Sequence, residues 1–347
     1  MPEFTWSIPP NCSDRSLVAM EQMMISSKNG MPCCMRIPMS DGITAGPDSI
    51  DKWEDDEEIS KLASCNVNPL AVTVFSGPPG SIGINPKTKN ALFISEIRNH
   101  EPWNGIVQMF DEIWTTPGRP FDVMNSISPK VPRPVVPSSS PPSLIPGFQI
   151  PEGSPVVMMH EEWEDARGVE SVVRAWLRSP DFKNGVLIVS MRSSFIDQSS
   201  ALMTRIRMEE GCPVGRNKIF LLTSPSRRIL DHCLSSSDIL VCAHVEERGW
   251  RPLAIKAALS GKQIVSTNRG DITKHISNCT WVETPDLKNV TYESMEQAMS
   301  RMTEGFRSGM IESLSSDAKS PIVIKMSGNK MMEFLKEAGD RLLSPGE

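Results

Sequence analysis

The sequence lacks the features that mark membrane and secreted proteins. No apolar stretch approaches the roughly 18 uninterrupted residues that a membrane-spanning helix needs. The beginning, MPEFTWSIPPNCSDR, does not show the basic segment followed by an apolar one that is typical of a secretory signal. We therefore expect a soluble, intracellular protein of the cytoplasm with no transmembrane segment.

Cysteine and histidine are too sparse for an evident metal site. The eight cysteines include no C-x-x-C pair, and the five histidines include no H-E-x-x-H motif and no pair spaced i, i+4. Eight cysteines in 347 residues are also too few for a disulfide scaffold. We expect reduced, mostly buried thiols, no metal and no other cofactor.

The charge balance argues against nucleic acid as a partner. The chain has 36 Lys and Arg against 42 Asp and Glu, a formal charge of −6, and its basic residues are scattered. Hydrophobic residues make up 39% and charged residues 22%, close to the globular average. A length of 347 residues is enough for two domains of ordinary size.

A stretch rich in proline and serine divides the chain. Nine of the 29 prolines lie between Pro129 and Pro155. Because proline fixes φ and favours extended backbone, this stretch predicts a semi-rigid linker. We expect a first domain over residues 1–133, a linker over 134–155, a second domain over 156–320 and a final helix over 321–347.

Short apolar runs alternate with helix-like segments on both sides of the linker. This alternation is typical of parallel sheets with helices on both faces, and it predicts an α/β fold of two doubly wound, Rossmann-like domains. In such sheets ligands bind beyond the carboxyl ends of the strands, so we expect a site in the cleft between the domains.

Two helices end the chain; either both cover the second sheet or one crosses back to the first domain. The predicted strands are 4–8, 32–39, 70–75, 91–96 and 112–115, then 156–159, 186–190, 218–223, 239–242, 263–266 and 280–282. The predicted helices are 14–27 and 51–64, then 166–178, 200–210, 226–235 and 252–259, before the two final helices.

The segment 236–270 reads as a strand, a glycine turn, a helix, a second glycine and another strand. Gly249 permits a tight turn, and Pro252 suits the first turn of a helix. Gly261 suits the left-handed residue just past the helix end. The N–H groups of residues 250–253 would open the helix, and they form an anion site suited to a diphosphate.

This segment resembles the donor-binding core of GT-B glycosyltransferases, in the large retaining group that uses nucleotide sugars. That family reads E-G-F-G-x-x-x-x-E-A-x-A-x-G and then P-V-V-x-T-x-x-G-G. Gly249 and Trp250 match the G-F pair, residues 257–261 match the A-x-A-x-G tail, and residues 264–270 match the strand and loop that follow. Further segments resemble other parts of the family in the same order: 90–96, 110–118 and 134–137 in the first half, and the K-G-x-x-x-L-x-x-A helix at 166–176.

The resemblance implies a metal-independent, retaining transferase. Its co-substrate would be a nucleoside-diphosphate sugar, from which a hexose passes to a glycan, lipid or protein acceptor. Arg167 stands where the family has a lysine that contacts the diphosphate, and arginine keeps the charge. The implied donor and phosphate contacts are Arg167, Gly249, Trp250, Arg251, Leu253 and Lys256.

Two residues are candidates for catalysis. Glu247 takes the place of the first family glutamate if the alignment shifts by one residue; without the shift that place holds Arg248. His100 follows a predicted strand end, where a histidine could contact sugar or transfer a proton. An exposed loop histidine without a role is the alternative for His100.

The sequence also departs from the family at positions that handle the donor. Arg251 replaces the second glycine, and Lys256 replaces the second glutamate. In that family the two glutamates contact the sugar and ribose of the donor, and an ammonium cannot accept a hydrogen bond from a ribose hydroxyl. The alternative hypothesis is therefore a catalytically inactive GT-B-like scaffold or binding protein.

Overall fold

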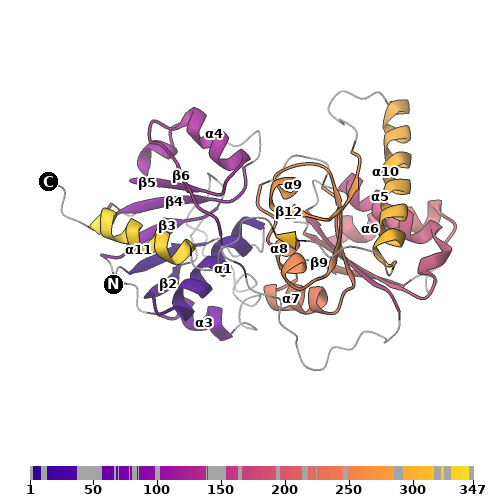
Figure 1. Cartoon of the computed structure of the whole chain (residues 1–347), viewed down its shortest axis with the longest axis horizontal. Helices are drawn as coiled ribbons and strands as arrows, with labels where there is room; N and C mark the ends of the chain where they lie inside the picture. The colour runs from indigo at the N-terminus through magenta and orange to yellow at the C-terminus, as the bar shows by residue number, and fades with distance from the viewer. Residues whose placement is uncertain are drawn as a thin grey trace. The chain divides into compact units, whose positions relative to one another are not determined.

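The chain divides into two compact units in a computed structural model (Figure 1). Unit 1 comprises Met1–Ser139, Arg248–Pro252 and Lys325–Glu347, and unit 2 comprises Ser140–Glu247 and Leu253–Ile324. The structure describes residues 3–8, 14–36, 57–65, 68, 70–77, 79, 84, 86–97, 102–137, 139, 154–162, 166–192, 196–212, 218–223, 225–244, 249–284, 292–315, 322–323 and 330–343.

A parallel sheet of six strands forms the centre of unit 1. The strand order is β2-β1-β3-β4-β5-β6, and all neighbours run parallel. The strands are short and largely buried because helices cover both faces of the sheet. They are β1 (Phe4–Ser7), β2 (Cys33–Arg36), β3 (Val72–Phe75), β4 (Asn90–Ile94), β5 (Glu112–Thr115) and β6 (Arg133–Pro134).

The path of the chain places the helices of unit 1. The chain moves from β1 to one edge at β2 and then back across the sheet to β6, so right-handed crossovers put α1 on one face and α3 and α4 on the other. Strand residues alternate accordingly: Trp6 packs on Phe93, whereas Leu92 joins a cluster with Met124 of α4. The elements are α1 (Asp14–Lys28), α3 (Glu57–Ala63), the 3-10 turn η2 (Val107–Met109), α4 (Arg119–Ile127) and the final helix α11 (Lys330–Leu343).

Helix α11 belongs to unit 1, so one of the two final helices crosses back to the first half of the chain. Phe334 packs edge-to-face on Trp114 with the ring centroids 5.1 Å apart. Arg341 donates from Nε and Nη2 to the two carboxylate oxygens of Glu112 at 3.0 and 3.2 Å. The same carboxylate accepts the indole N–H of Trp114 at 2.8 Å, so one partly buried acid joins the helix to the sheet.

Unit 2 is built on a second parallel sheet of six strands. The order is β13-β11-β10-β7-β8-β9, with all neighbours parallel. The strands are β7 (Val156–Glu162), β8 (Val186–Arg192), β9 (Lys218–Thr223), β10 (Ile239–Cys242), β11 (Gln263–Thr267) and β13 (Thr280–Val282). A separate antiparallel pair joins β12 (Ile276–Ser277) to β14 (Ile322–Val323).

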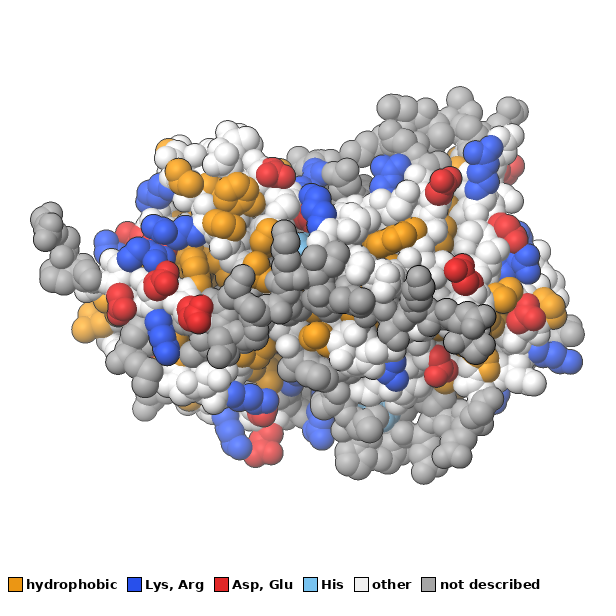
Figure 2. Space-filling model, viewed as in Figure 1, with side chains coloured by type: hydrophobic (Ala, Val, Ile, Leu, Met, Phe, Trp, Pro, Cys, Tyr) orange, Lys and Arg blue, Asp and Glu red, His pale blue; other side chains and the backbone are white. Residues whose placement is uncertain are grey.

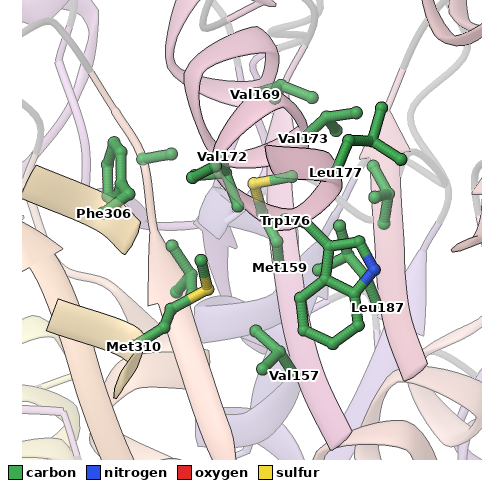
Figure 3. Packing of buried hydrophobic residues seen from close by; sticks show 14 of the residues in the cluster. Val157, Met159, Val169, Val172, Val173, Trp176, Leu177, Leu187, Phe306 and Met310 are labelled. Atoms are coloured by element: carbon green, nitrogen blue, oxygen red, sulfur yellow. The ribbon is translucent and has the colours of Figure 1, made fainter. Parts of the chain in front are cut away.

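Helices cover both faces of the second sheet as well. Val172, Val173 and Trp176 point from α5 onto the sheet, where Phe306 and Met310 of α10 join them (Figure 3). The chain moves from β7 toward β9 and then returns past β7 to β11, so right-handed crossovers put α7 and α8 on the opposite face from α5 and α6. The elements are α5 (Ala166–Arg178), η4 (Pro180–Phe182), α6 (Ile196–Glu209), α7 (Arg227–Ser235), α8 (Pro252–Leu259), α9 (Ile272–His275) and α10 (Tyr292–Ser313).

Two parallel sheets flanked by helices confirm the predicted α/β fold. Within the residues described, no helix combines the length and the apolar character that crossing a membrane requires. On the face shown in Figure 2, basic and acidic side chains lie interspersed over both units.

Candidate functional site

The strand order of unit 2 places a candidate ligand site at the ends of β7 and β10. The chain goes from β7 to β8 on one side, while β10 on the other side continues to β11. Two neighbouring strands that lead in opposite directions form a topological switch point, where doubly wound sheets bind ligands beyond the strand ends. Here Glu161 of β7 accepts the backbone N–H of Ala243 on Oε1 at 2.6 Å. The Glu161 residue is 1% exposed, so this bond fixes the backbone at the end of β10.

The start of α5 lies against the same backbone. A Cβ atom on Gly168 would be 1.6 Å from the carbonyl oxygen of Ala243, so only glycine fits there. The neighbouring Arg167 is exposed, and its Nη1 donates to Met295 Sδ at 3.6 Å. The predicted phosphate-binding arginine thus stands one residue from the switch point, with its guanidinium open to solvent.

Histidine side chains link two pairs of neighbouring strands, β7 with β8 and the ends of β10 and β11. His160 Nδ1 is 2.8 Å from the hydroxyl of Ser190 on the neighbouring β8. His244, which is fully buried, donates from Nε2 to the carbonyl of Arg269 at 2.8 Å, since a carbonyl can only accept. Thr267 donates its hydroxyl to the carbonyl of His244 at 2.7 Å. These bonds fix the backbone at the carboxyl ends of β10 and β11.

The helix α8 begins and ends as the sequence predicts. Pro252 occupies its first turn, and Gly261 has a φ of 68° just past its end. The N–H of Lys262 closes that end by donating to the carbonyl of Ala257 at 2.9 Å.

Gly249, in the segment before α8, is required for a different reason than the tight turn that the sequence suggests. The φ of Gly249 is not in the left-handed region; instead, a Cβ there would be 2.4 Å from the carbonyl oxygen of Ser95, within unit 1. The Trp250 N–H donates to that same oxygen at 3.1 Å. In this structure the Trp250 amide is therefore engaged by backbone, and Pro252 has no amide to offer the predicted anion site.

Lys256 lies in a buried ion pair. Its Nζ is 2.9 and 3.2 Å from the two carboxylate oxygens of Asp231 on α7, and the two side chains are 5% and 3% exposed. Arg227 Nη1 approaches the same carboxylate at 3.2 Å. The positive charge of Lys256, which replaces a glutamate of the pattern that the sequence resembles, is thus paired with Asp231 on α7.

The remaining predicted residues have different surroundings. Arg251 and Leu253 are each 7% exposed, and Trp250 is 3% exposed. Glu247 and His100 lie outside the described residues, so their predicted roles stay predictions. Among the residues that the structure describes, no group of three or more His, Cys, Asp or Glu side chains could hold a metal ion.

Sequence reasoning missed two acids, Glu161 and Asp231. Glu161 bonds to Ala243, 82 positions away, and Asp231 pairs with Lys256, 25 positions away. Residues separated this far along the sequence do not form a local motif. The sequence did offer one indication: Glu161 lies in an apolar strand, and Asp231 lies on the apolar face of a helix. Charged groups are rarely buried without a partner, so each acid could have been expected to have one.

Comparisons with known proteins bear on the fold. No protein-family model and no curated protein matches the chain. Solved structures do match it along almost its whole length. A glycosyltransferase from Rickettsia africae ESF-5 gives a TM-score of 0.57 at 13% identity, with 99% of both chains covered.

Two further solved structures match over 99% of this chain and 100% of their own. Alr3699/HepE from Anabaena, in complex with UDP and glucose, gives a TM-score of 0.58 at 8% identity. Sucrose-phosphate synthase from Thermosynechococcus elongatus gives 0.57 at 11% identity. At these sequence identities, structural similarity shows the fold alone. The chain has the two-domain fold of GT-B glycosyltransferases.

Proposed function

We propose that this chain is a glycosyltransferase that moves a hexose from a nucleoside-diphosphate sugar to a glycan, lipid or protein acceptor. We further propose that it works without a metal and retains the anomeric configuration. The fold supports the proposal because the solved structures that match it include a glycosyltransferase and a protein in complex with UDP and glucose. The observation that carries it is the switch point of unit 2, where Glu161 and Gly168 fix the backbone beside an exposed Arg167.

Each residue of the site has a proposed part in the reaction. Arg167 neutralises the diphosphate as negative charge develops on the leaving group, and its planar fork suits phosphate oxygens. The first amides of α8 add a partial positive charge on the same group. Glu247 is proposed to contact the donor sugar, and His100 to contact the acceptor or transfer its proton.

Calorimetric titration with a panel of nucleoside diphosphates tests the proposal. We expect one nucleotide to bind in the micromolar to millimolar range, and Arg167→Ala to weaken that binding about tenfold, since a charge-assisted contact contributes about 1.5–3 kcal/mol. The matched control is Arg301→Ala, which removes another exposed arginine of unit 2, on α10, and should leave both binding and melting temperature unchanged. Absence of binding by every nucleotide at millimolar concentration would overturn the enzymatic reading.

The second candidate is a GT-B-like binding protein without transferase activity. The Lys256–Asp231 pair favours it, because the ammonium occupies the family's glutamate position and is held by a buried acid. A donor site lacking that glutamate loses an acceptor for the ribose hydroxyls. Nucleotide binding without hydrolysis or transfer of any nucleoside-diphosphate sugar would favour this candidate, whereas turnover would exclude it.

A further inference from the structure

Two cysteines of unit 1 meet although they are far apart in the sequence. Cys34 lies in β2, the strand at one edge of the sheet, and Cys65 follows α3, which packs against β2. The two side chains share a hydrogen bond. Cys65 Sγ also lies 3.2 Å from the carbonyl oxygen of Lys61, the acceptor of its thiol proton. Neither cysteine is in a disulfide; Cys34 is buried and Cys65 is exposed.

The neighbouring Cys33 has different surroundings. Successive strand residues point to opposite faces, so Cys33 faces away from Cys34. Burial raises the pKa of Cys33 to about 12, so it stays protonated at neutral pH. Cys33 is therefore a matched control for any chemistry assigned to Cys34.

We propose that Cys34 and Cys65 are a reversible disulfide site that ties the end of α3 to the edge strand β2 when the protein meets a peroxide. Cys65 is exposed and reacts first: its sulfur attacks hydrogen peroxide, an S–O bond forms, the O–O bond breaks, and one water leaves with the thiol proton. The sulfur of Cys34 then attacks the sulfur of Cys65, the S–S bond forms, the S–O bond breaks, and a second water carries away the Cys34 proton. Two thiols and one peroxide thus give one disulfide and two waters, and a dithiol reductant reverses the reaction.

The environments of the two thiols fit this order. Burial raises the pKa of Cys34 to about 11, which keeps it a thiol out of the reach of solvent oxidant until Cys65 has reacted. The disulfide closes a loop of about 30 residues and so restricts the unfolded chain. We expect oxidation to raise the unfolding temperature of unit 1 by about 5–10 °C.

The test treats the full-length protein with one equivalent of hydrogen peroxide, blocks the remaining thiols, and maps peptides by mass spectrometry without reduction. We expect a peptide pair joined through Cys34 and Cys65 that disappears on addition of dithiothreitol. Cys33→Ser should form the same pair at an unchanged rate, and Cys65→Ser should lose it together with the rise in unfolding temperature. Because Cys65 is exposed, its serine variant is expected to fold even where a substitution of buried Cys34 does not.

Three results would overturn the proposal. The first is the absence of the Cys34–Cys65 peptide pair at a stoichiometric dose of peroxide. The second is a bond of Cys65 to Cys33 or to another chain instead. The third is a correct bond that leaves the unfolding temperature unchanged or lowers it, because such a bond does not tie α3 to the sheet.

Discussion

At the residue scale, Lys256 and Asp231 form a buried ion pair at a position where the sequence departs from the pattern that it resembles. Removing one partner of a buried pair leaves the other charge uncompensated, at a cost of about 3–5 kcal/mol. Asp231→Leu should cost that much, because it leaves Lys256 and Arg227 without their acid. Lys256→Met should cost less, about 1–3 kcal/mol, because Arg227 still holds the carboxylate.

A double-mutant cycle measured by urea denaturation checks this order. The double variant Asp231→Leu and Lys256→Met should recover most of the lost free energy of unfolding, since apolar residues of similar volume often replace a buried pair well. Strictly additive effects of the two substitutions would show that the ammonium and the carboxylate do not interact in solution.

Gly168 gives a second prediction at this scale. Gly168→Ala places a Cβ 1.6 Å from the Ala243 carbonyl oxygen, so α5 or β10 must shift, at a cost of about 3 kcal/mol or more. Gly211 is the control: its φ is 61° and nothing lies within 4 Å of an added Cβ, so Gly211→Ala should cost about 1 kcal/mol. Equal losses of unfolding free energy in the two variants would contradict the close packing at the switch point.

At the element scale, α5 and α6 are joined by a network of ion pairs. Arg174 bonds to Glu170 at 2.7 Å and to Glu210 at 2.5 Å, and Arg178 bonds to both carboxylate oxygens of Glu210 at 2.8 Å. Exposed ion pairs contribute little, but Glu210 is only 10% exposed at its side chain and is shared by two arginines. The network therefore holds the two helices in one register over the sheet.

The pH dependence of stability tests this network. Hydrogen bonds from Arg178 and Arg174 outweigh burial and lower the pKa of Glu210 from its ordinary value of 4.5. Because the folded pKa is below the unfolded one, the stabilisation is complete above pH 4.5 and is lost as pH falls through the folded pKa. In acid titrations of unfolding free energy, Glu210→Gln should flatten this loss, and Glu312→Gln, an exposed control on α10, should not.

The anchoring of α11 shows a similar use of a partly buried acid, Glu112. Burial alone would raise the pKa of Glu112, but hydrogen bonds from Arg341 and Trp114 lower it overall. Arg341→Ala leaves that carboxylate short of its main partner, so we expect a loss of about 1–3 kcal/mol and easier proteolytic release of the C-terminus. The control is Lys336→Ala on the same helix, at an exposed position. Equal proteolysis of both variants would show that Glu112 does not anchor the helix.

Elements that combine an apolar core with clear end signals could be predicted from the sequence. The observed α5, β9, β10 and α8 have the bounds that the sequence predicts, because polar or glycine-containing segments flank each of them. Elements without such a pattern were missed. The helix α4 carries Pro120 in its first turn after Gly118, a composition typical of loops, and β6, β12 and β14 span two residues each.

The candidate site was predictable where its chemistry is local. The capping role of Gly261 follows from residues that adjoin it in sequence, and the structure confirms it. The requirement for Gly249 comes instead from the Ser95 carbonyl, 154 positions away, and no sequence pattern reports such an approach. Partners that lie on other elements, such as Asp231 for Lys256, depend on the packing of the fold.

At the scale of the whole molecule, two sheets with separate clusters of buried side chains predict separate unfolding events. Leu92 in β4 of unit 1 and Leu187 in β8 of unit 2 are both fully buried, so their truncation gives matched cavities in the two cores. Each Leu→Ala change should cost about 3 kcal/mol and lower one transition temperature by about 6–12 °C. Differential scanning calorimetry should resolve two transitions, with Leu92→Ala moving only one and Leu187→Ala only the other. A single transition that both variants lower equally would mean that the two units unfold as one cooperative unit, which would contradict the prediction.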